Sequence, residues 1–158
     1  MTKITNNLLD QINSLYPDIS IIKGDVFYWS PSDQIVYYSE LNNEVDQWSL
    51  LHEVGHAISE HRNFKSDFDL LLIEVEAWEQ AKKISDRLSI SIDEDHIQDC
   101  LDTYRDWLYL RSTCPTCTNT SLQIDSRTYS CINCNQSWNV TQSRQKRCYR
   151  KKVPAKTL

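Results

Sequence analysis

Residues 48–61 read WSLLHEVGHAISEH, and the spacing of their apolar side chains predicts a buried helix over about residues 45–61. This helix carries two histidines four positions apart, His52 and His56. Because residues i and i+4 lie on the same face of an α-helix, both imidazoles can direct a nitrogen at one point. Zinc accepts such nitrogens at about 2.0–2.1 Å. The stretch therefore predicts a metal-binding helix, with Glu53 about 100° further round and within reach of a water beside the metal.

Gly55 lies in the interior of this predicted helix, between the two histidines. Glycine costs about 1 kcal/mol relative to alanine at such a position, because it leaves the backbone freer in the unfolded chain. We therefore expect that a neighbouring strand or helix approaches the backbone closely at Gly55.

The composition changes along the chain. Its 158 residues, 40% of them hydrophobic, indicate one folded domain, or a small domain with an appendage. Residues 1–113 carry 9 basic and 21 acidic side chains, a net charge of −12, whereas residues 114–158 carry 8 and 1, a net charge of +7. Five of the six cysteines lie in the basic part. We therefore expect a first domain over residues 1–112, a cysteine-rich module over 113–140 and a basic tail over 141–158.

The N-terminal residues, MTKITNNLLDQINSLYPD, interleave polar with apolar side chains, which is not the pattern of a signal peptide. No run approaches the roughly 18 apolar residues that a membrane span needs. We therefore expect a soluble, cytoplasmic protein with no membrane partner.

Short runs of β-branched and aromatic residues precede the histidine helix. They cover residues 19–22, 26–30 and 35–39 and predict a small antiparallel sheet. Apolar periodicity predicts further helices over residues 5–16, 67–88 and 91–111. Ser91 and Glu94 form a capping-box pattern at the start of the last of these helices. The expected fold class is therefore α+β, with a small antiparallel sheet packed on the histidine helix and two further helices.

A catalytic zinc needs a third protein ligand and one open coordination position. An HExxHxxGxxH motif would have glycine at position 59 and histidine at 62, but the chain has Ser59 and Arg62, which excludes that class. His61 more simply ends the helix, and His96, which begins another helix, is a distant second choice. A carboxylate from an adjacent antiparallel helix would complete a His₂Glu set. The predicted helix over residues 67–88 offers three candidates: Glu74, Glu76 and Glu79.

The stretch LLHEVGHAISEH followed by EVEAWEQA resembles the minigluzincins and the related ImmA/IrrE-type metallopeptidases, over about Ile19 to Leu88. Those proteins carry a Glu-x-x-Ala-(Asn/Asp/Trp) signature on a downstream helix, which implies that Glu74 is the third ligand and leaves Glu76 as the alternative. Trp78 stands where such proteins often carry Asp or Asn, which removes a possible polar partner for a ligating histidine. The resemblance also implies that residues 35–39 form an edge strand, to which a polypeptide substrate adds as a further strand.

Together these features predict a zinc-dependent metalloendopeptidase of the gluzincin type. His52, His56 and Glu74 would hold the catalytic zinc, and Glu53 would act as general base on the metal-activated water that attacks the peptide bond. Some minigluzincins are held latent by their C-terminal segment, so the resemblance also implies that the C-terminal region of this chain can cover the cleft.

The cysteine-rich module has two CxxC pairs thirteen residues apart, which is the ligand spacing of a structural zinc ribbon. Two disulfides would be the alternative, but they do not suit a cytoplasmic chain. Zinc knuckles usually place glycine after the second cysteine, whereas this chain has Thr118 and Asn135, so we expect the first knuckle to be irregular. With the catalytic site, the sequence predicts two Zn²⁺ ions per chain. The structural ion would be held by Cys114, Cys117, Cys131 and Cys134.

The C-terminal residues, SRQKRCYRKKVPAKTL, are basic and contain no acidic side chain. They fit either a solvated end of the chain or a segment that contacts nucleic-acid phosphates. The alternative function is therefore a nucleic-acid-associated regulatory protein with a structural or inactive HExxH site. The peptidase interpretation is favoured because neither an RNP-like sequence nor a helix-turn-helix signature accompanies the basic segment.

Overall fold

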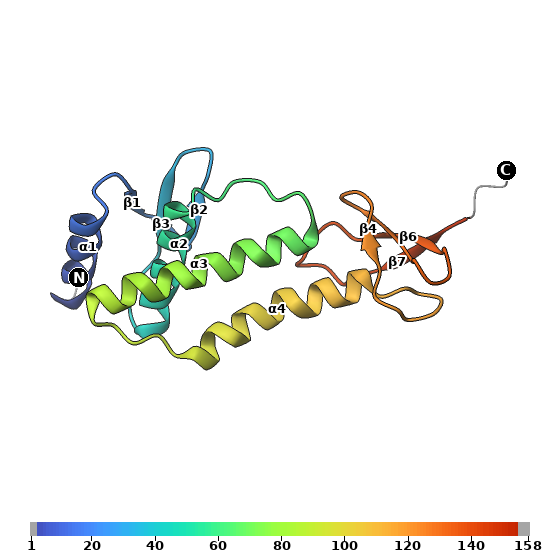
Figure 1. Cartoon of the computed structure of the whole chain (residues 1–158). Helices are drawn as coiled ribbons and strands as arrows, with labels where there is room; N and C mark the ends of the chain where they lie inside the picture. Colours follow the sequence, from blue (N-terminus) through green and yellow to red (C-terminus); the bar gives the residue numbers. More distant parts are fainter. Residues whose placement is uncertain (1–2, 155–158) are drawn as a thin grey trace. The chain divides into compact units, whose positions relative to one another are not determined.

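The structure, a computed structural model, describes residues 3–154 (Figure 1). Four helices and seven short strands make up an α+β fold, which confirms the expected class. The helices form where apolar periodicity predicts them. In chain order the elements are α1 (Lys3–Leu15), β1 (Ser20–Lys23), β2 (Tyr28–Ser30), β3 (Ile35–Tyr38), α2 (Glu44–Ile58), α3 (Asp67–Leu88), α4 (Glu94–Ser112), β4 (Leu122–Gln123), β5 (Thr128–Ser130), β6 (Ser137–Val140) and β7 (Arg150–Val153).

The chain divides into two compact units that do not follow the expected boundaries at residues 112 and 140. Unit 1 comprises residues 1–63 and 73–97, and unit 2 comprises residues 64–72 and 98–158. The difference arises because the long helices α3 and α4 each contribute residues to both units. Four residues of the expected basic tail form β7, which pairs with β6. Residues 155–158 of that segment lie outside the described residues.

Unit 1 contains a three-stranded mixed sheet in the order β1-β3-β2. Strand β2 is antiparallel to β3, but β1 is parallel to it, so the expected all-antiparallel sheet is wrong. The chain from β1 to β2 does not fold back as a hairpin, and β3 enters between the two strands. Val36 at the centre of β3 is therefore fully buried, and the edge strands are β1 and β2, not residues 35–39 as expected.

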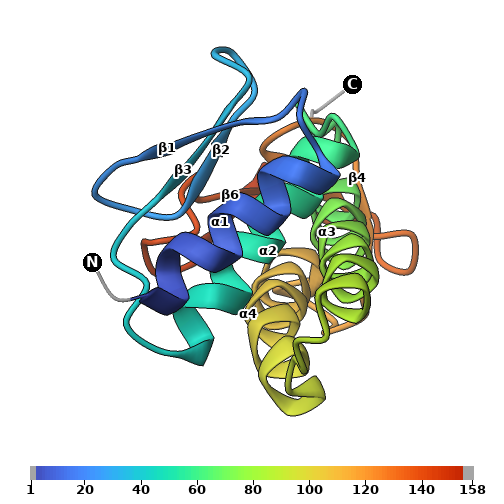
Figure 2. The same cartoon turned by 90° about the vertical axis from the view of Figure 1, so that its left-hand side faces the viewer.

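Helix α2 lies between this sheet and α3 (Figure 2). Its N-cap residue is Asn43, whose side chain accepts a hydrogen bond from the backbone N–H of Asp46, while the Asp46 side chain accepts one from the backbone N–H of Asn43. At Gly55 the two helices touch, and a Cβ atom added there would lie 2.3 Å from the carbonyl oxygen of Ala77. The close approach expected at Gly55 is therefore present, and the neighbouring element is α3.

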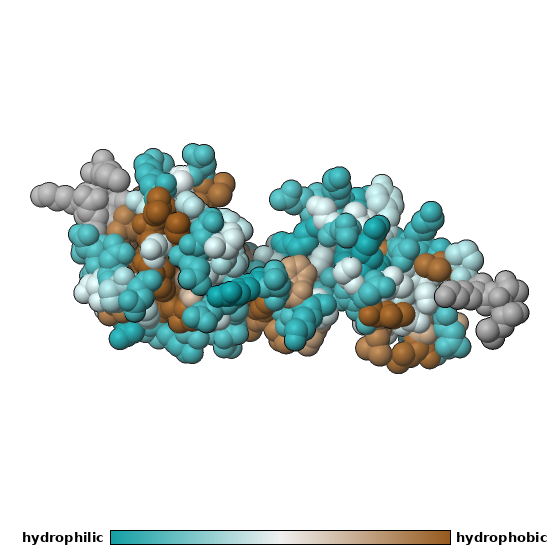
Figure 3. Space-filling model, turned by 90° about the horizontal axis from the view of Figure 1, so that it is seen from above, coloured by the Kyte–Doolittle hydropathy of each residue, from teal (hydrophilic) through white to brown (hydrophobic). Residues whose placement is uncertain are grey.

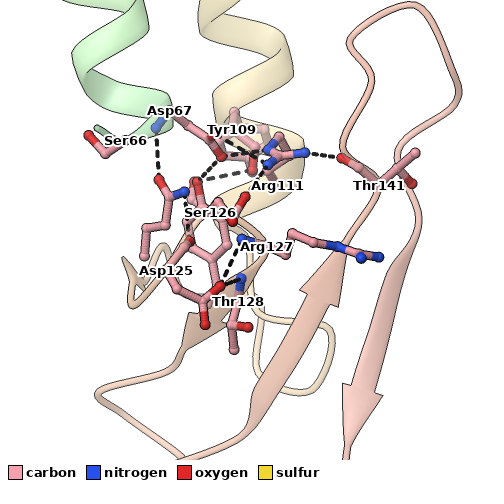
Figure 4. Close-up of polar contacts among 12 residues, drawn as sticks. Ser66, Asp67, Tyr109, Arg111, Asp125, Ser126, Arg127, Thr128 and Thr141 are labelled. Atoms are coloured by element: carbon pink, nitrogen blue, oxygen red, sulfur yellow. Dashed lines mark hydrogen bonds and ion pairs between the residues drawn. The ribbon is translucent and has the colours of Figure 1, made fainter. Parts of the chain in front are cut away.

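Unit 2 contains a four-stranded antiparallel sheet in the order β4-β5-β6-β7. A buried ion pair holds this sheet to the parts of α3 and α4 in the same unit (Figure 4). The Arg111 side chain donates to both carboxylate oxygens of Asp67, at 2.5 and 3.3 Å, and the Tyr129 hydroxyl donates to the same carboxylate at 2.6 Å. Trp138 of β6 donates its indole N–H to the carbonyl of Arg111 at 2.9 Å.

The exposed surface carries hydrophobic patches among polar side chains (Figure 3). The exposed large hydrophobic side chains include Ile22, Val26 and Tyr28 in unit 1, on or next to the sheet edges. In unit 2 they include Phe68, Leu72, Tyr109 and Leu122. Within residues 3–154, the apolar stretch of every helix falls short of what crossing a bilayer requires.

Candidate metal centres

The two histidines of α2 and one glutamate of α3 converge on one point in unit 1. The Nε2 atoms of His52 and His56 lie 3.1 Å apart, and Glu74 Oε2 lies 3.2 Å from the first of them. Glu74 Oε1 lies 3.7 Å from His56 Nε2. Among the described residues, the group that shares this point has three members, and Glu76 is not one of them. The sequence reasoning thus named all three members, although it left the choice between the two glutamates open.

The Glu74 carboxylate is buried, and a buried anion requires a positively charged or hydrogen-bonding partner nearby. Its side chain is only 10% exposed, and its ion pairs within residues 3–154 are with His52 and His56 alone. Burial opposes ionisation of Glu74, but the hydrogen bonds from the two histidines outweigh burial and hold its pKa far below the ordinary value. Two imidazole nitrogens and one buried carboxylate are a donor set that zinc binds, so the residues present fit the expected ion.

The ring of His52 is oriented by packing and not by a polar partner. The Trp78 indole lies against it with ring centroids 4.4 Å apart and an interplanar angle of 32°. His52 Nδ1 is buried and has no hydrogen-bond partner within the described part of the chain. An Asp or Asn at position 78 could hydrogen-bond to the histidine. Trp78 instead holds the His52 ring by contact between the two ring faces.

Glu53 is held by the sheet and stays outside the three-residue group. The backbone N–H of Trp29 on edge strand β2 donates to Glu53 Oε2 at 2.7 Å. Trp29 lies opposite Val36 of β3, and because its N–H donates to Glu53, that N–H points toward α2 and not into the ladder. One carboxylate oxygen is thereby fixed. Sequence reasoning missed the role of Trp29, because a backbone donor leaves no mark in side-chain identity.

His61 lies just beyond α2 and contacts its last turn. Its Nδ1 atom is 2.9 Å from Nδ1 of His56, and its Nε2 atom is 3.2 Å from Glu76 Oε2. Burial lowers the pKa of His61 below its ordinary value, against the opposing effect of the hydrogen bond to Glu76. The other candidate histidine, His96, packs against the rings of Trp48 and Trp78 and does not join the metal-ligand group.

The four cysteines of the two CxxC pairs converge in unit 2. The Sγ atoms of Cys114 and Cys134 are 3.6 Å apart and those of Cys117 and Cys131 are 3.5 Å apart, far beyond the roughly 2.05 Å of a disulfide. These spacings are close to the edge of about 3.8 Å of a tetrahedron with zinc–sulfur bonds of about 2.3 Å. The backbone N–H of Asn119 is the largest influence that lowers the pKa of Cys117, to about 6, which favours its thiolate form. The pKa of Cys134 is raised instead, because the lowering effect of the Gln136 backbone is outweighed by burial and by hydrogen bonds with the neighbouring thiols.

Both knuckles of this site have the same backbone, so the expected irregularity of the first is wrong. Thr118 and Asn135 take left-handed conformations, with φ of 64° and 60°. Their backbone N–H groups donate to the carbonyls of Cys114 and Cys131, at 3.0 and 2.9 Å. Thr118 thus adopts a conformation that a β-branched residue disfavours, and the hydrogen bond from its N–H to the Cys114 carbonyl closes the turn.

No protein-family model matches this chain, and comparisons with curated protein sequences and with solved structures likewise find no similar protein. We therefore infer the function from the geometry of the two clusters themselves.

Proposed function

We propose that the chain is a zinc-dependent metalloendopeptidase of the gluzincin type, whose metal ligands are His52, His56 and Glu74. The observation that carries this proposal is the pairing of a three-ligand cluster with a fixed carboxylate from the same helix. The convergence of His₂Glu donors provides a metal site. Glu53 lies next to the first histidine in the chain and outside the ligand set, held at one oxygen by Trp29. A purely structural metal site would have no use for this free carboxylate oxygen.

Zinc in this site supplies a lowered pKa for water and polarisation of the scissile carbonyl. Glu53 accepts the proton of the attacking water at the oxygen that Trp29 does not occupy, and then delivers that proton to the leaving amine. The Trp29 N–H prevents the carboxylate from rotating away from this position. It also keeps one acceptor site of Glu53 occupied, so that the proton is handled at the other oxygen.

The substrate strand adds to β2, the edge of the sheet from which Trp29 reaches Glu53. Because the Trp29 N–H already donates to Glu53, an extended polypeptide pairs with the other backbone groups of β2 that do not take part in the ladder with β3. This assignment replaces the earlier expectation for residues 35–39, which lie at the centre of the sheet. The polypeptide substrate is therefore bound mainly through its backbone.

The four-cysteine cluster holds a second zinc with a structural role, because its four thiolates complete the tetrahedral coordination of the ion. The proposal therefore includes two zinc ions per chain, one in each unit.

The variant Glu53→Gln tests the peptidase function, because glutamine keeps the size of the side chain and its bond to Trp29 but cannot accept the proton. We expect loss of at least about 100-fold in cleavage of an unfolded test protein, with the zinc content unchanged. Glu79→Gln, on the exposed side of α3, is the matched control and should cleave as the wild type does. Equal cleavage by Glu53→Gln and wild type would refute the assigned role. A zinc-loaded wild type that cleaves no unfolded polypeptide would instead favour the nucleic-acid-associated alternative.

A further inference from the structure

The end of α2 is a turn that folds the chain back over its last residues. Glu60 has a left-handed backbone with φ of 51°. The N–H of Glu60 donates to the carbonyl of Ala57 and the N–H of His61 donates to the carbonyl of His56, both at 3.1 Å. These two bonds define a Schellman motif, in which the residue after the left-handed one contacts a residue of the last turn. That contact is commonly hydrophobic, but here it joins two imidazoles.

The two rings meet nitrogen to nitrogen. Nδ1 of His56 and Nδ1 of His61 are 2.9 Å apart, and the rings cross at 71° with centroids 5.1 Å apart. A hydrogen bond at this distance needs one nitrogen with a proton and one with a free lone pair. His56 presents its other nitrogen, Nε2, to the metal-ligand group, where only an unprotonated nitrogen can bind a metal. When a metal is bound, the proton of His56 must therefore lie on Nδ1, and His61 Nδ1 must accept it.

The same reasoning fixes the proton on the second ring. Since His61 Nδ1 accepts, its proton lies on Nε2, and Nε2 faces Glu76 Oε2 at 3.2 Å. The Glu76 carboxylate can only accept, so His61 Nε2–H donates to Glu76 and His56 Nδ1–H donates to His61 Nδ1. His61 is also held from behind, because the Trp29 indole N–H donates to its carbonyl at 2.7 Å. Its side chain is only 9% exposed, which limits competition from water.

We propose that His61 is a positioning residue which, oriented by Glu76, holds His56 in the tautomer and ring orientation that direct Nε2 at the metal. This inference rests on the proposed metal site and adds two residues, His61 and Glu76, that support one of its ligands. The two ligating histidines differ in this respect, since His52 has only the face of Trp78 and an Nδ1 atom with no partner in the described residues. The hydrogen-bonded orientation of the site therefore depends on the His56 side.

Two substitutions at His61 separate its hydrogen bond from its packing. His61→Leu keeps an apolar contact of the kind that Schellman motifs favour, so it should fold, but it offers His56 no acceptor. His61→Asn can place its side-chain oxygen where Nδ1 lies. We expect His61→Leu to weaken zinc binding at the His₂Glu site by about 10–100-fold in chelator competition, and His61→Asn to restore much of that loss. The zinc of the four-cysteine site reports correct folding and should be released as in the wild type.

Glu76→Gln, compared with Glu79→Gln on the same helix, tests the outer member of the series. Glutamine can still accept the proton of His61 Nε2 but can equally present its amide, so we expect a smaller loss of zinc affinity than in His61→Leu. The exposed Glu79 control should leave the affinity unchanged. Cobalt(II) in place of zinc adds a spectroscopic reading, because the visible absorption of the His₂Glu site should change in His61→Leu and be largely recovered in His61→Asn.

The tautomer itself can be measured in the zinc-loaded wild type by ¹⁵N NMR of the histidine rings. A proton on His56 Nδ1 and on His61 Nε2 supports the inference, and the reverse assignment overturns it even if a variant does not fold. Zinc affinity and cobalt spectrum of His61→Leu equal to those of the wild type would also overturn it. If zinc binding depends on His61 but no polypeptide is cleaved, the peptidase proposal fails and the positioning role stands. If polypeptide is cleaved but His61→Leu changes neither the zinc affinity nor the cobalt spectrum, the positioning role fails and the peptidase proposal stands.

Discussion

At the scale of single residues, the left-handed position after each CxxC pair offers a direct test of backbone strain. Thr118 is exposed and has φ of 64°. A β-branched residue in this region costs about 1–3 kcal/mol, whereas glycine adopts it freely. We expect Thr118→Gly to raise the free energy of unfolding of unit 2 by about 1 kcal/mol and to slow zinc release to a chelator. Denaturant unfolding with parallel zinc release measures both.

Asn135→Gly is the matched control for this prediction, since it lies at the same position of the second knuckle, with φ of 60°. Asparagine tolerates the left-handed region, so the gain there should be clearly smaller. A larger gain at Asn135 than at Thr118 would show that side-chain contacts, and not backbone strain, decide stability at these turns.

Residue identity predicted the ligands better than it predicted their supports. His52 and His56 follow from spacing alone, but the roles of His61 and Trp29 depend on where a turn and a strand edge place them. The turn before His61 cannot be predicted from the sequence, because its left-handed residue is Glu60 and not the glycine or asparagine that marks such turns. The capping prediction failed similarly. Asp93 caps α4 through the N–H of Asp95, so the predicted cap at Ser91 is wrong.

At the scale of elements, the contact between α2 and α3 determines whether Glu74 can reach the histidines. Gly55→Ala places a methyl group against the carbonyl of Ala77, where a Cβ would lie 2.3 Å from backbone that cannot swing aside. The helix itself would gain about 1 kcal/mol from alanine. Forced separation of packed elements costs about 1–3 kcal/mol and occasionally more. We expect a net loss of stability in unit 1 and weaker zinc binding at the His₂Glu site, because Glu74 lies one turn before Ala77 on α3.

Gly24→Ala is the matched control in the same unit, because the three atoms nearest to its added methyl group all belong to the side chain of Tyr37, the closest at 3.3 Å. Thermal unfolding and chelator competition on both variants measure the difference. Equal zinc affinity in Gly55→Ala and wild type would mean that the two helices can separate without moving Glu74, which would contradict the prediction.

Periodicity located the elements but not the order in which the strands pair. The sequence indicated three strands before α2, and all three exist. Which strand lies in the centre depends on how the chain between Lys23 and Tyr28 turns, and nothing in that segment specifies a hairpin. Instead Gly24 donates to the carbonyl of Tyr38 at 2.8 Å and extends the pairing of β1 with β3. The mixed sheet follows from this non-local bond, which alternating hydrophobicity cannot reveal.

At the scale of the whole molecule, composition located the four-cysteine ribbon but not the unit that contains it. The change of charge and cysteine content near residue 112 marks where α4 ends. It cannot show that residues 64–72 and 98–112 belong with the ribbon, because those segments share the composition of the first half. That the C-terminal region covers the cleft stays a prediction, which cleavage assays on a chain lacking residues 113–158 would test.

The last prediction concerns the buried ion pair of Arg111 and Asp67. We expect that breaking this pair destabilises unit 2 as a whole. Their side chains are 2% and 4% exposed, and Arg111 also donates to the carbonyl of Thr141. Arg111→Met leaves the Asp67 carboxylate buried without its cation, which typically costs about 3–5 kcal/mol. Because the pair joins the start of α3, the end of α4 and the sheet, we expect lower stability together with faster loss of the cysteine-bound zinc.

Arg105→Met is the control, since Arg105 pairs with Asp102 at the surface and such pairs contribute about 0–1 kcal/mol. The double variant Asp67→Leu with Arg111→Met should recover much of the lost stability, because it removes the unpaired Asp67 carboxylate together with Arg111. Denaturant unfolding followed by tryptophan fluorescence, with zinc release recorded in parallel, compares all three. If Arg111→Met were no less stable than Arg105→Met, the ribbon would be an independent module after all. The expected result means instead that four thiolates alone do not hold unit 2 together, and that a fragment beginning at residue 113 lacks both members of its central ion pair.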